Sequence, residues 1–131
     1  MWKQIKDSVY DVSDNGIIRN RISGKIMKSH LTDKGYVRIG LRIEKNKEKK
    51  YRVNRIVAEA FLSNYNDNME VHHINNIRTD NRVSNLECIS SEENKLRRNY
   101  LTIKEIIEKT IFMIKENSEL NYDDIIKKLL K

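Results

Sequence analysis

The spacing of apolar residues changes repeatedly between residues 53 and 94, and this succession limits the folds that the chain can adopt. Five apolar residues recur at helical spacing and share one face over residues 53–62: Val53, Ile56, Val57, Ala60 and Phe61. Residues 69–74 and 86–89 have the composition of strands, and the polar segment 75–82 separates them. The run Ser90-Ser91-Glu92-Glu93 fits a capping box that opens another helix. The succession predicts a helix, an antiparallel hairpin and a second helix.

Residues 9–43 are predicted to form short strands joined by turns. Asp14-Asn15-Gly16 is a strong turn signal between two extended stretches. Residues 35–43 alternate in type, and the face opposite the apolar one carries Tyr36, Arg38, Gly40 and Arg42. Residues 44–50 are predicted to be a charged, solvated turn. A strand with one apolar and one basic face suits a small sheet that docks on nucleic acid.

The basic charge of the chain is concentrated in its first part. Residues 1–52 carry 14 Lys and Arg against 6 Asp and Glu, whereas residues 53–100 carry 6 against 7. Residues 101–131 carry 6 of each, and the net charge of the whole chain is +7. Because the excess of basic residues is confined to residues 1–52, we expect this part of the chain to bind a polyanion such as DNA. The alternative, a basic surface that is only solvated, explains such a local excess less well.

Two amphipathic helices are predicted within residues 101–131. The first covers about 102–116, and the second begins near Asn121. The pair resembles the first two helices of a helix-turn-helix domain, without the third helix that would read DNA. The tail is therefore at least as well suited to pack on the preceding part of the chain or on a second subunit.

The composition limits the class of protein. Hydrophobic residues make up 38% of the 131 residues and charged residues 34%, so only modest cores can form. The one cysteine, Cys88, excludes internal disulfides and cysteine-rich zinc clusters. No stretch is apolar enough for a membrane span or a signal peptide, and we expect a soluble, cytoplasmic protein. We predict a modular α+β chain divided at residues 1–52, 53–100 and 101–131.

The predicted hairpin carries two adjacent histidines and two spaced asparagines. His72 and His73 lie near the end of its first strand, Asn85 directly precedes its second strand, and Asn94 falls in the first turn of the following helix. Histidine suits a general base because its ordinary pKa of about 6.5 leaves a neutral ring at pH 7. With the helix before it, the pattern resembles the HNH nuclease family, and most of all the small HNH homing endonucleases of phages and mobile introns.

The resemblance implies a central ββα-metal (His-Me finger) core and metal-dependent hydrolysis of DNA to 5′-phosphate and 3′-hydroxyl ends. It gives His73 the role of general base, and Asn85 the role of bracing the loop that orients this base. His72 and Asn94 would be the metal ligands. An oxygen-rich shell favours Mg²⁺ or Mn²⁺. His72 stands where many relatives have aspartate, which shifts the preference toward Mn²⁺, Ni²⁺ or Zn²⁺.

Residues 2–43 resemble, more loosely, the small DNA-binding unit that precedes many phage HNH nucleases. Trp2, Ile5 and Tyr10 would form a small core of this unit. The candidate contacts to double-stranded DNA are basic residues of this unit, of the hairpin and of the following helix: Arg19, Arg21, Lys25, Lys28, Arg38, Arg42, Arg78, Arg82 and Lys95.

We therefore predict a site-preferring DNA endonuclease of the homing type, encoded by a phage and active in a bacterial host cell. One such active site cuts one strand, so a monomer would nick DNA, and a homodimer formed through residues 101–131 would cut both strands. Two alternatives stay open. One is a DNA-binding regulator that keeps the HNH fold with little or no catalysis. The other is a nonspecific, toxin-like nuclease, which explains the basic first part less well.

Overall fold

The computed structural model describes residues 1–44, 47–116, 123 and 127, and these fall into two compact units. The first unit comprises Met1–Ser90 and the second Ser91–Lys131. The mixed α and β content and the small antiparallel sheets confirm the predicted α+β class.

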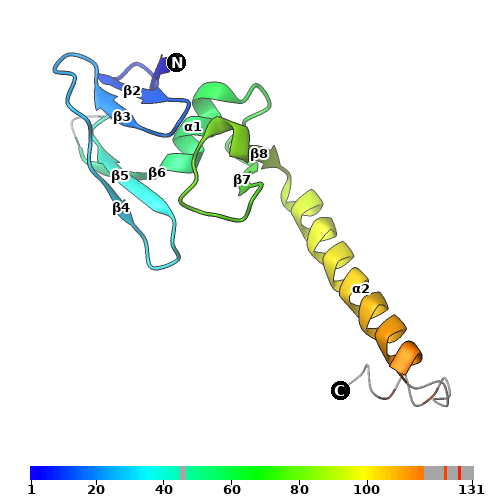
Figure 1. Ribbon diagram of the computed structural model, residues 1–131. Helices are drawn as coiled ribbons and strands as arrows, with labels where there is room; N and C mark the ends of the chain where they lie inside the picture. The colour runs from blue at the N-terminus through cyan, green and yellow to red at the C-terminus, as the bar shows by residue number, and fades with distance from the viewer. Residues whose placement is uncertain (45–46, 117–122, 124–126, 128–131) are drawn as a thin grey trace. The chain divides into compact units, whose positions relative to one another are not determined.

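The first unit contains three small antiparallel sheets (Figure 1). The first sheet has the strand order β1 (Trp2–Gln4), β2 (Tyr10–Ser13) and β3 (Ile18–Asn20). The second has the order β4 (Ser29–Leu31), β5 (Val37–Leu41) and β6 (Lys49–Arg52). The third is the hairpin of β7 (Glu70–His73) and β8 (Leu86–Ile89). Helix α1 (Val53–Phe61) follows β6, and the short 3-10 helix η1 (Val83–Asn85) leads into β8.

Helix α1 packs against strands of all three sheets and joins them through one hydrophobic core. Six side chains of this core are almost fully buried: Val12, Ile18, Ile39, Leu41, Val53 and Val57. Of the predicted apolar face of α1, Val53, Ile56 and Val57 are buried, and Ala60 and Phe61 are half-buried. Asn54 and Ala58 are also buried, which the spacing did not predict. Residues from both sides of position 52 therefore share a single core.

Two local predictions for the first part of the chain are confirmed. Strand β5 buries Ile39 and Leu41, whereas Arg38 and Gly40, which alternate with them, are only half-buried. Gly16 ends the predicted turn with φ of 83°, a backbone conformation that glycine adopts without steric cost. The predicted turn over residues 44–50 is too long, because β6 already begins at Lys49 and pairs with Leu41.

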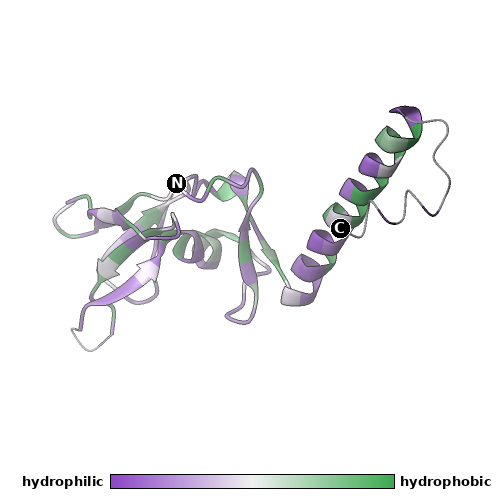
Figure 2. Ribbon diagram, turned by 90° about the horizontal axis from the view of Figure 1, so that it is seen from below, coloured by the Kyte–Doolittle hydropathy of each residue, from purple (hydrophilic) through white to green (hydrophobic). Residues whose placement is uncertain are grey.

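The second unit differs from the two-helix prediction. A single helix, α2 (Ser91–Glu116), replaces the separate helices expected to open near Ser90 and at residue 102. The sequence between them contains neither glycine nor proline, so nothing interrupts helical hydrogen bonding there. None of the residues of α2 is buried, and hydrophobic residues recur along its whole length (Figure 2). The helix predicted from Asn121 falls almost entirely outside the described residues. Among the helices that the structure describes, none is long and apolar enough to cross a membrane.

Candidate active site

The β7–β8 hairpin places the two histidines at the end of its first strand. His72 lies opposite Glu87 and His73 opposite Leu86. Neighbouring residues of a regular strand point to opposite faces, so the two histidines can share a site only where the strand ends or bends. Strand β7 ends at His73, and the N–H of Asn76 donates to the carbonyl of His73 at 2.9 Å. Asn76 adopts φ of 61°, a conformation that asparagine tolerates better than most residues.

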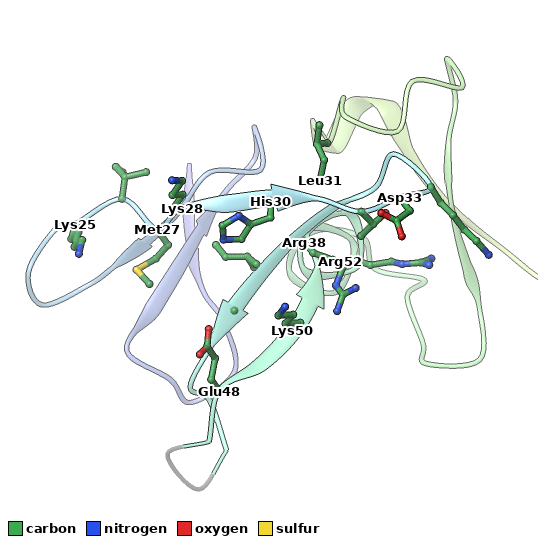
Figure 3. Close-up of a pocket in the computed structure, with 15 residues that line it drawn as sticks. Lys25, Met27, Lys28, His30, Leu31, Asp33, Arg38, Glu48, Lys50 and Arg52 are labelled. Atoms are coloured by element: carbon green, nitrogen blue, oxygen red, sulfur yellow. The ribbon is translucent and has the colours of Figure 1, made fainter.

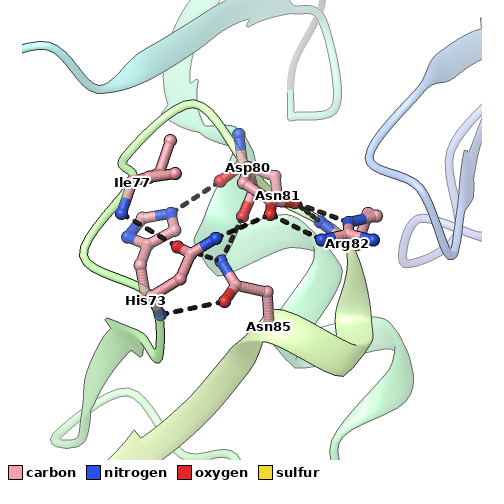
Figure 4. A network of polar contacts seen from close by, with 7 residues as sticks. His73, Ile77, Asp80, Asn81, Arg82 and Asn85 are labelled. Carbon is pink, nitrogen blue, oxygen red and sulfur yellow. Dashed lines mark hydrogen bonds and ion pairs between the residues drawn. The ribbon is translucent and has the colours of Figure 1, made fainter.

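The ring of His73 is buried and held by one side chain. His73 is 4% exposed, and its Nε2 lies 2.8 Å from Oδ1 of Asn81 (Figure 4). Because an amide oxygen only accepts hydrogen bonds, Nε2 carries the ring proton in this arrangement. The other nitrogen of the neutral ring, Nδ1, then has a free electron pair. A histidine in this tautomer can accept a proton at Nδ1.

Asn85 ties together the two ends of segment 74–82, which connects β7 to η1. Its Nδ2 donates to Oδ1 of Asn75 and to the carbonyl of Asp80, both at 2.9 Å. In return, the N–H of Asn75 donates to Oδ1 of Asn85 at 3.0 Å. The N–H of Ile74 donates to the carbonyl of Asn85 at 2.8 Å. Asn85 is 6% exposed and thereby fixes the segment that begins directly after His73.

An ion pair completes this polar network. Arg82 donates from Nε and from its terminal nitrogen to the two carboxylate oxygens of Asp80, both at 2.8 Å (Figure 4). These bonds, with a further one from Asn75, hold the pKa of the Asp80 carboxyl well below its usual range. The same pair raises the pKa of the Arg82 guanidinium. Asp80 therefore stays ionised and keeps Arg82 beside the loop.

The outer face of the β4–β5–β6 sheet forms an open, basic groove of about 1240 Å³ (Figure 3). Its lining includes six Lys and Arg residues against Asp33 and Glu48: Lys25, Lys28, Lys34, Arg38, Lys50 and Arg52. The positive excess and the open shape suit a polyanionic backbone. Three of these residues were predicted as DNA contacts. Lys34, Lys50 and Arg52 were missed. Lys50 and Arg52 reach the groove through the pairing of β6 with β5, and Lys34 lies in the turn between β4 and β5.

Comparison with known proteins identifies both parts of the first unit. A family model described as HNH endonuclease matches residues 51–96, and one described as NUMOD4 motif matches residues 1–42. The chain contains an HNH endonuclease domain that follows a NUMOD4 motif.

Named relatives are similar to this chain over most of its length. The DNA endonuclease I-HmuI of Bacillus phage SP01 is 33% identical over 107 residues, which are 78% of this chain and 61% of that protein. YosQ, an SPbeta prophage-derived protein of Bacillus subtilis, is 31% identical over 94 residues, 72% of this chain and 54% of its own. A solved structure describes DNA binding and cleavage by the HNH homing endonuclease I-HmuI. That structure matches 97% of this chain with a TM-score of 0.66 and 26% identity.

The chain spans less than two thirds of each of these proteins, with 64% of the solved I-HmuI chain covered. The structural match supports the predicted arrangement of small antiparallel sheets followed by a C-terminal helix.

The remaining basic residues proposed to contact DNA lie in different settings. In the NUMOD4 motif, Arg19 and Arg21 each pair with Asp11 at 3.3 Å, and Arg19 also lies over the ring of Trp2. Arg42 is exposed and lies outside the lining of the groove. In the HNH domain, Arg78 donates to the carbonyl of Lys34 and lies 4.7 Å from the ring centre of Tyr36.

The HNH family implies a divalent metal, and the described residues supply only part of a shell for one. Among them, no group of three or more His, Cys, Asp or Glu side chains could hold a metal ion. The imidazole of His72 is half-buried at the end of β7. Asn94, the second predicted ligand, and Lys95 belong to the first turns of α2, in the other unit. The imidazole of His72 is a ligand type that suits a divalent metal whose other positions are taken by oxygen ligands such as water and phosphate.

Proposed function

We propose that the chain is a metal-dependent DNA endonuclease in which His73 is the general base. One observation carries this proposal: Nε2 of the buried His73 lies 2.8 Å from Oδ1 of Asn81. This contact favours the tautomer with the ring proton on Nε2, which leaves the electron pair of Nδ1 available. The resemblance to I-HmuI, named as a DNA endonuclease, supports the reaction class.

The reaction would begin when Nδ1 of His73 removes a proton from a water molecule. The resulting hydroxide attacks the phosphorus in line with the leaving oxygen, and the P–O3′ bond breaks. The leaving O3′ takes a proton from a water molecule and His73 returns its proton to solvent, which gives 5′-phosphate and 3′-hydroxyl ends. Asn85 keeps segment 74–82, and therefore the ring of His73, in position. A divalent metal held by His72 and Asn94 would stabilise negative charge on the phosphate and the leaving oxygen.

The basic groove is the proposed grip on double-stranded DNA. It lies within the first proposed module, residues 1–52, and the HNH domain supplies the chemistry. Site preference would arise from the groove, and a single active site would nick one strand. Residues 101–131 would mediate a homodimer if both strands are cut. The phage and prophage origin of the relatives supports a phage-encoded protein that acts in a bacterial host cell.

Supercoiled plasmid bearing the target sequence provides the first test. We expect conversion to open circles with Mg²⁺, Mn²⁺, Ni²⁺ or Zn²⁺, and no conversion in EDTA. A linear product at the earliest times would indicate paired active sites. DNA binding without cleavage under any of these metals would overturn the proposal and favour the regulator. Equal cleavage of target and unrelated DNA would instead favour the toxin-like nuclease.

The groove predicts a charge-dependent decrease in affinity. Lys50→Glu or Arg38→Glu should weaken DNA binding and lower the slope of log Kd against log salt by about one for each phosphate that the variant no longer neutralises. Lys6→Glu is the matched control, since Lys6 is exposed and lies outside the groove. Binding titrations between low and moderate salt measure the difference. Equal effects of Lys50→Glu and Lys6→Glu would place the DNA-binding surface elsewhere.

A further inference from the structure

The loop that carries Asn81 packs against the turn between β2 and β3. The N–H of Val83 donates to the carbonyl of Asp14 at 2.8 Å. Gly16 lies so close to Asn81 that a Cβ added at Gly16 would be 3.1 Å from Cβ of Asn81 and 3.3 Å from its carbonyl oxygen. Both distances are tighter than nine in ten real Cβ contacts, so Asn81 would have to move by a few tenths of an ångström to make room for a side chain at position 16.

A second turn of the first module touches the other side of the same loop. Arg78 donates to the carbonyl of Lys34, in the turn between β4 and β5. The ring of Tyr36, at the end of that turn, lies 4.7 Å from the Arg78 guanidinium and 6.3 Å from the ring of His73. The loop is therefore held between two turns of the NUMOD4 motif as well as by Asn85.

We propose that Gly16 is a positioning residue for the general base, acting through Asn81. The absence of a side chain at Gly16 lets Asn81 sit where its Oδ1 meets Nε2 of His73. That hydrogen bond selects the ring tautomer and the ring orientation. The NUMOD4 motif thus contributes to the chemistry of the HNH domain in addition to binding DNA. This inference rests on the proposed role of His73.

Gly24 offers a matched control for a substitution at Gly16. Both residues have positive φ, 83° for Gly16 and 73° for Gly24, so alanine introduces similar backbone strain at either position. No atom of the described residues lies within 4 Å of a Cβ added at Gly24. Gly16→Ala and Gly24→Ala therefore differ in the contact with Asn81. Gly16→Asn provides a second variant, since asparagine tolerates positive φ but still adds a Cβ.

The experiment compares these variants at saturating protein, so that differences in DNA affinity do not contribute. Gly16→Ala and Gly16→Asn should lower the single-turnover cleavage rate about tenfold, because small displacements of a catalytic group are costly. Gly24→Ala should stay within about twofold of wild type. If Gly16→Ala does not fold, Gly16→Asn gives the result.

Long-range ¹⁵N NMR of the histidine rings provides a readout that is independent of cleavage. The wild-type spectrum should show His73 as the Nε2–H tautomer, and the Gly16 variants should show a mixture of tautomers. Gly24→Ala should retain the wild-type pattern. Equal rates and equal His73 spectra for the Gly16 and Gly24 variants would overturn the inference.

His73→Ala separates failure of this inference from failure of the proposed function. If His73→Ala is inactive while the glycine variants behave alike, only the role of Gly16 is overturned. Full cleavage by His73→Ala would overturn the proposed base and, with it, the positioning role.

Discussion

Replacement of His73 by alanine is expected to lower the single-turnover rate of DNA cleavage by about 100-fold to 10,000-fold, the usual contribution of a general base. The effect should fall on the chemical step, because the buried ring would contact the attacking water rather than the bound duplex. Cleavage measured with protein in excess over plasmid isolates that step.

DNA affinity is the control for this variant. The basic groove lies on a different sheet from the β7–β8 hairpin, so His73→Ala should bind DNA with nearly the wild-type Kd. Retained affinity also shows that the shared core has folded. A rate close to wild type would remove His73 from the mechanism.

Replacement of Asn85 by alanine is expected to impair both stability and catalysis. It removes the hydrogen bonds of Asn85 to the side chain and N–H of Asn75 and to the carbonyl of Asp80. Unsatisfied polar groups should reduce the free energy of unfolding by about 1 to 3 kcal/mol. Release of segment 74–82 should displace His73, and a shift of about 1 Å can lower a rate by about 100-fold. Denaturant titration and single-turnover cleavage measure the two effects.

Asn64→Ala is the matched control for Asn85→Ala. Asn64 is exposed, and its Nδ2 donates to the carbonyl of Cys88 over a long distance of 3.4 Å. The free energy of unfolding should change by less than about 0.5 kcal/mol, as at other exposed sites. If Asn85→Ala and Asn64→Ala gave equal changes, the bracing role of Asn85 would be wrong.

The local parts of this architecture could be predicted from sequence because they depend on short-range patterns. The alternation of β5, the helical spacing of α1 and the turn at Gly16 each follow from neighbouring residue types. The hairpin was predicted in the same way, although its first strand, predicted over residues 69–74, covers Glu70–His73 and ends at His73. The helix expected at residue 102 was wrong because amphipathic spacing alone does not mark where α2 begins.

The contacts made between distant segments could not be predicted. Asn81 is one of several asparagines in a polar segment, and no spacing rule distinguishes it as the partner of His73. The approach of Gly16 to Asn81 depends on how the first sheet packs against the hairpin through α1. Lys50 and Arg52 likewise join the groove only because β6 pairs with β5.

The core centred on α1 restricts how such proteins can recombine. Val57 at its middle is fully buried, and the side chains packed there come from β2, β5, β6 and β8. A gene exchange near residue 52 would join residues 1–52 of one protein to the HNH domain of another. The two halves of the core would then come from different proteins and would not be matched in shape. If the outward-facing groove grips DNA as proposed, new target preferences would arise more easily by substitution in the groove, which lies outside the shared core, than by exchange of whole modules.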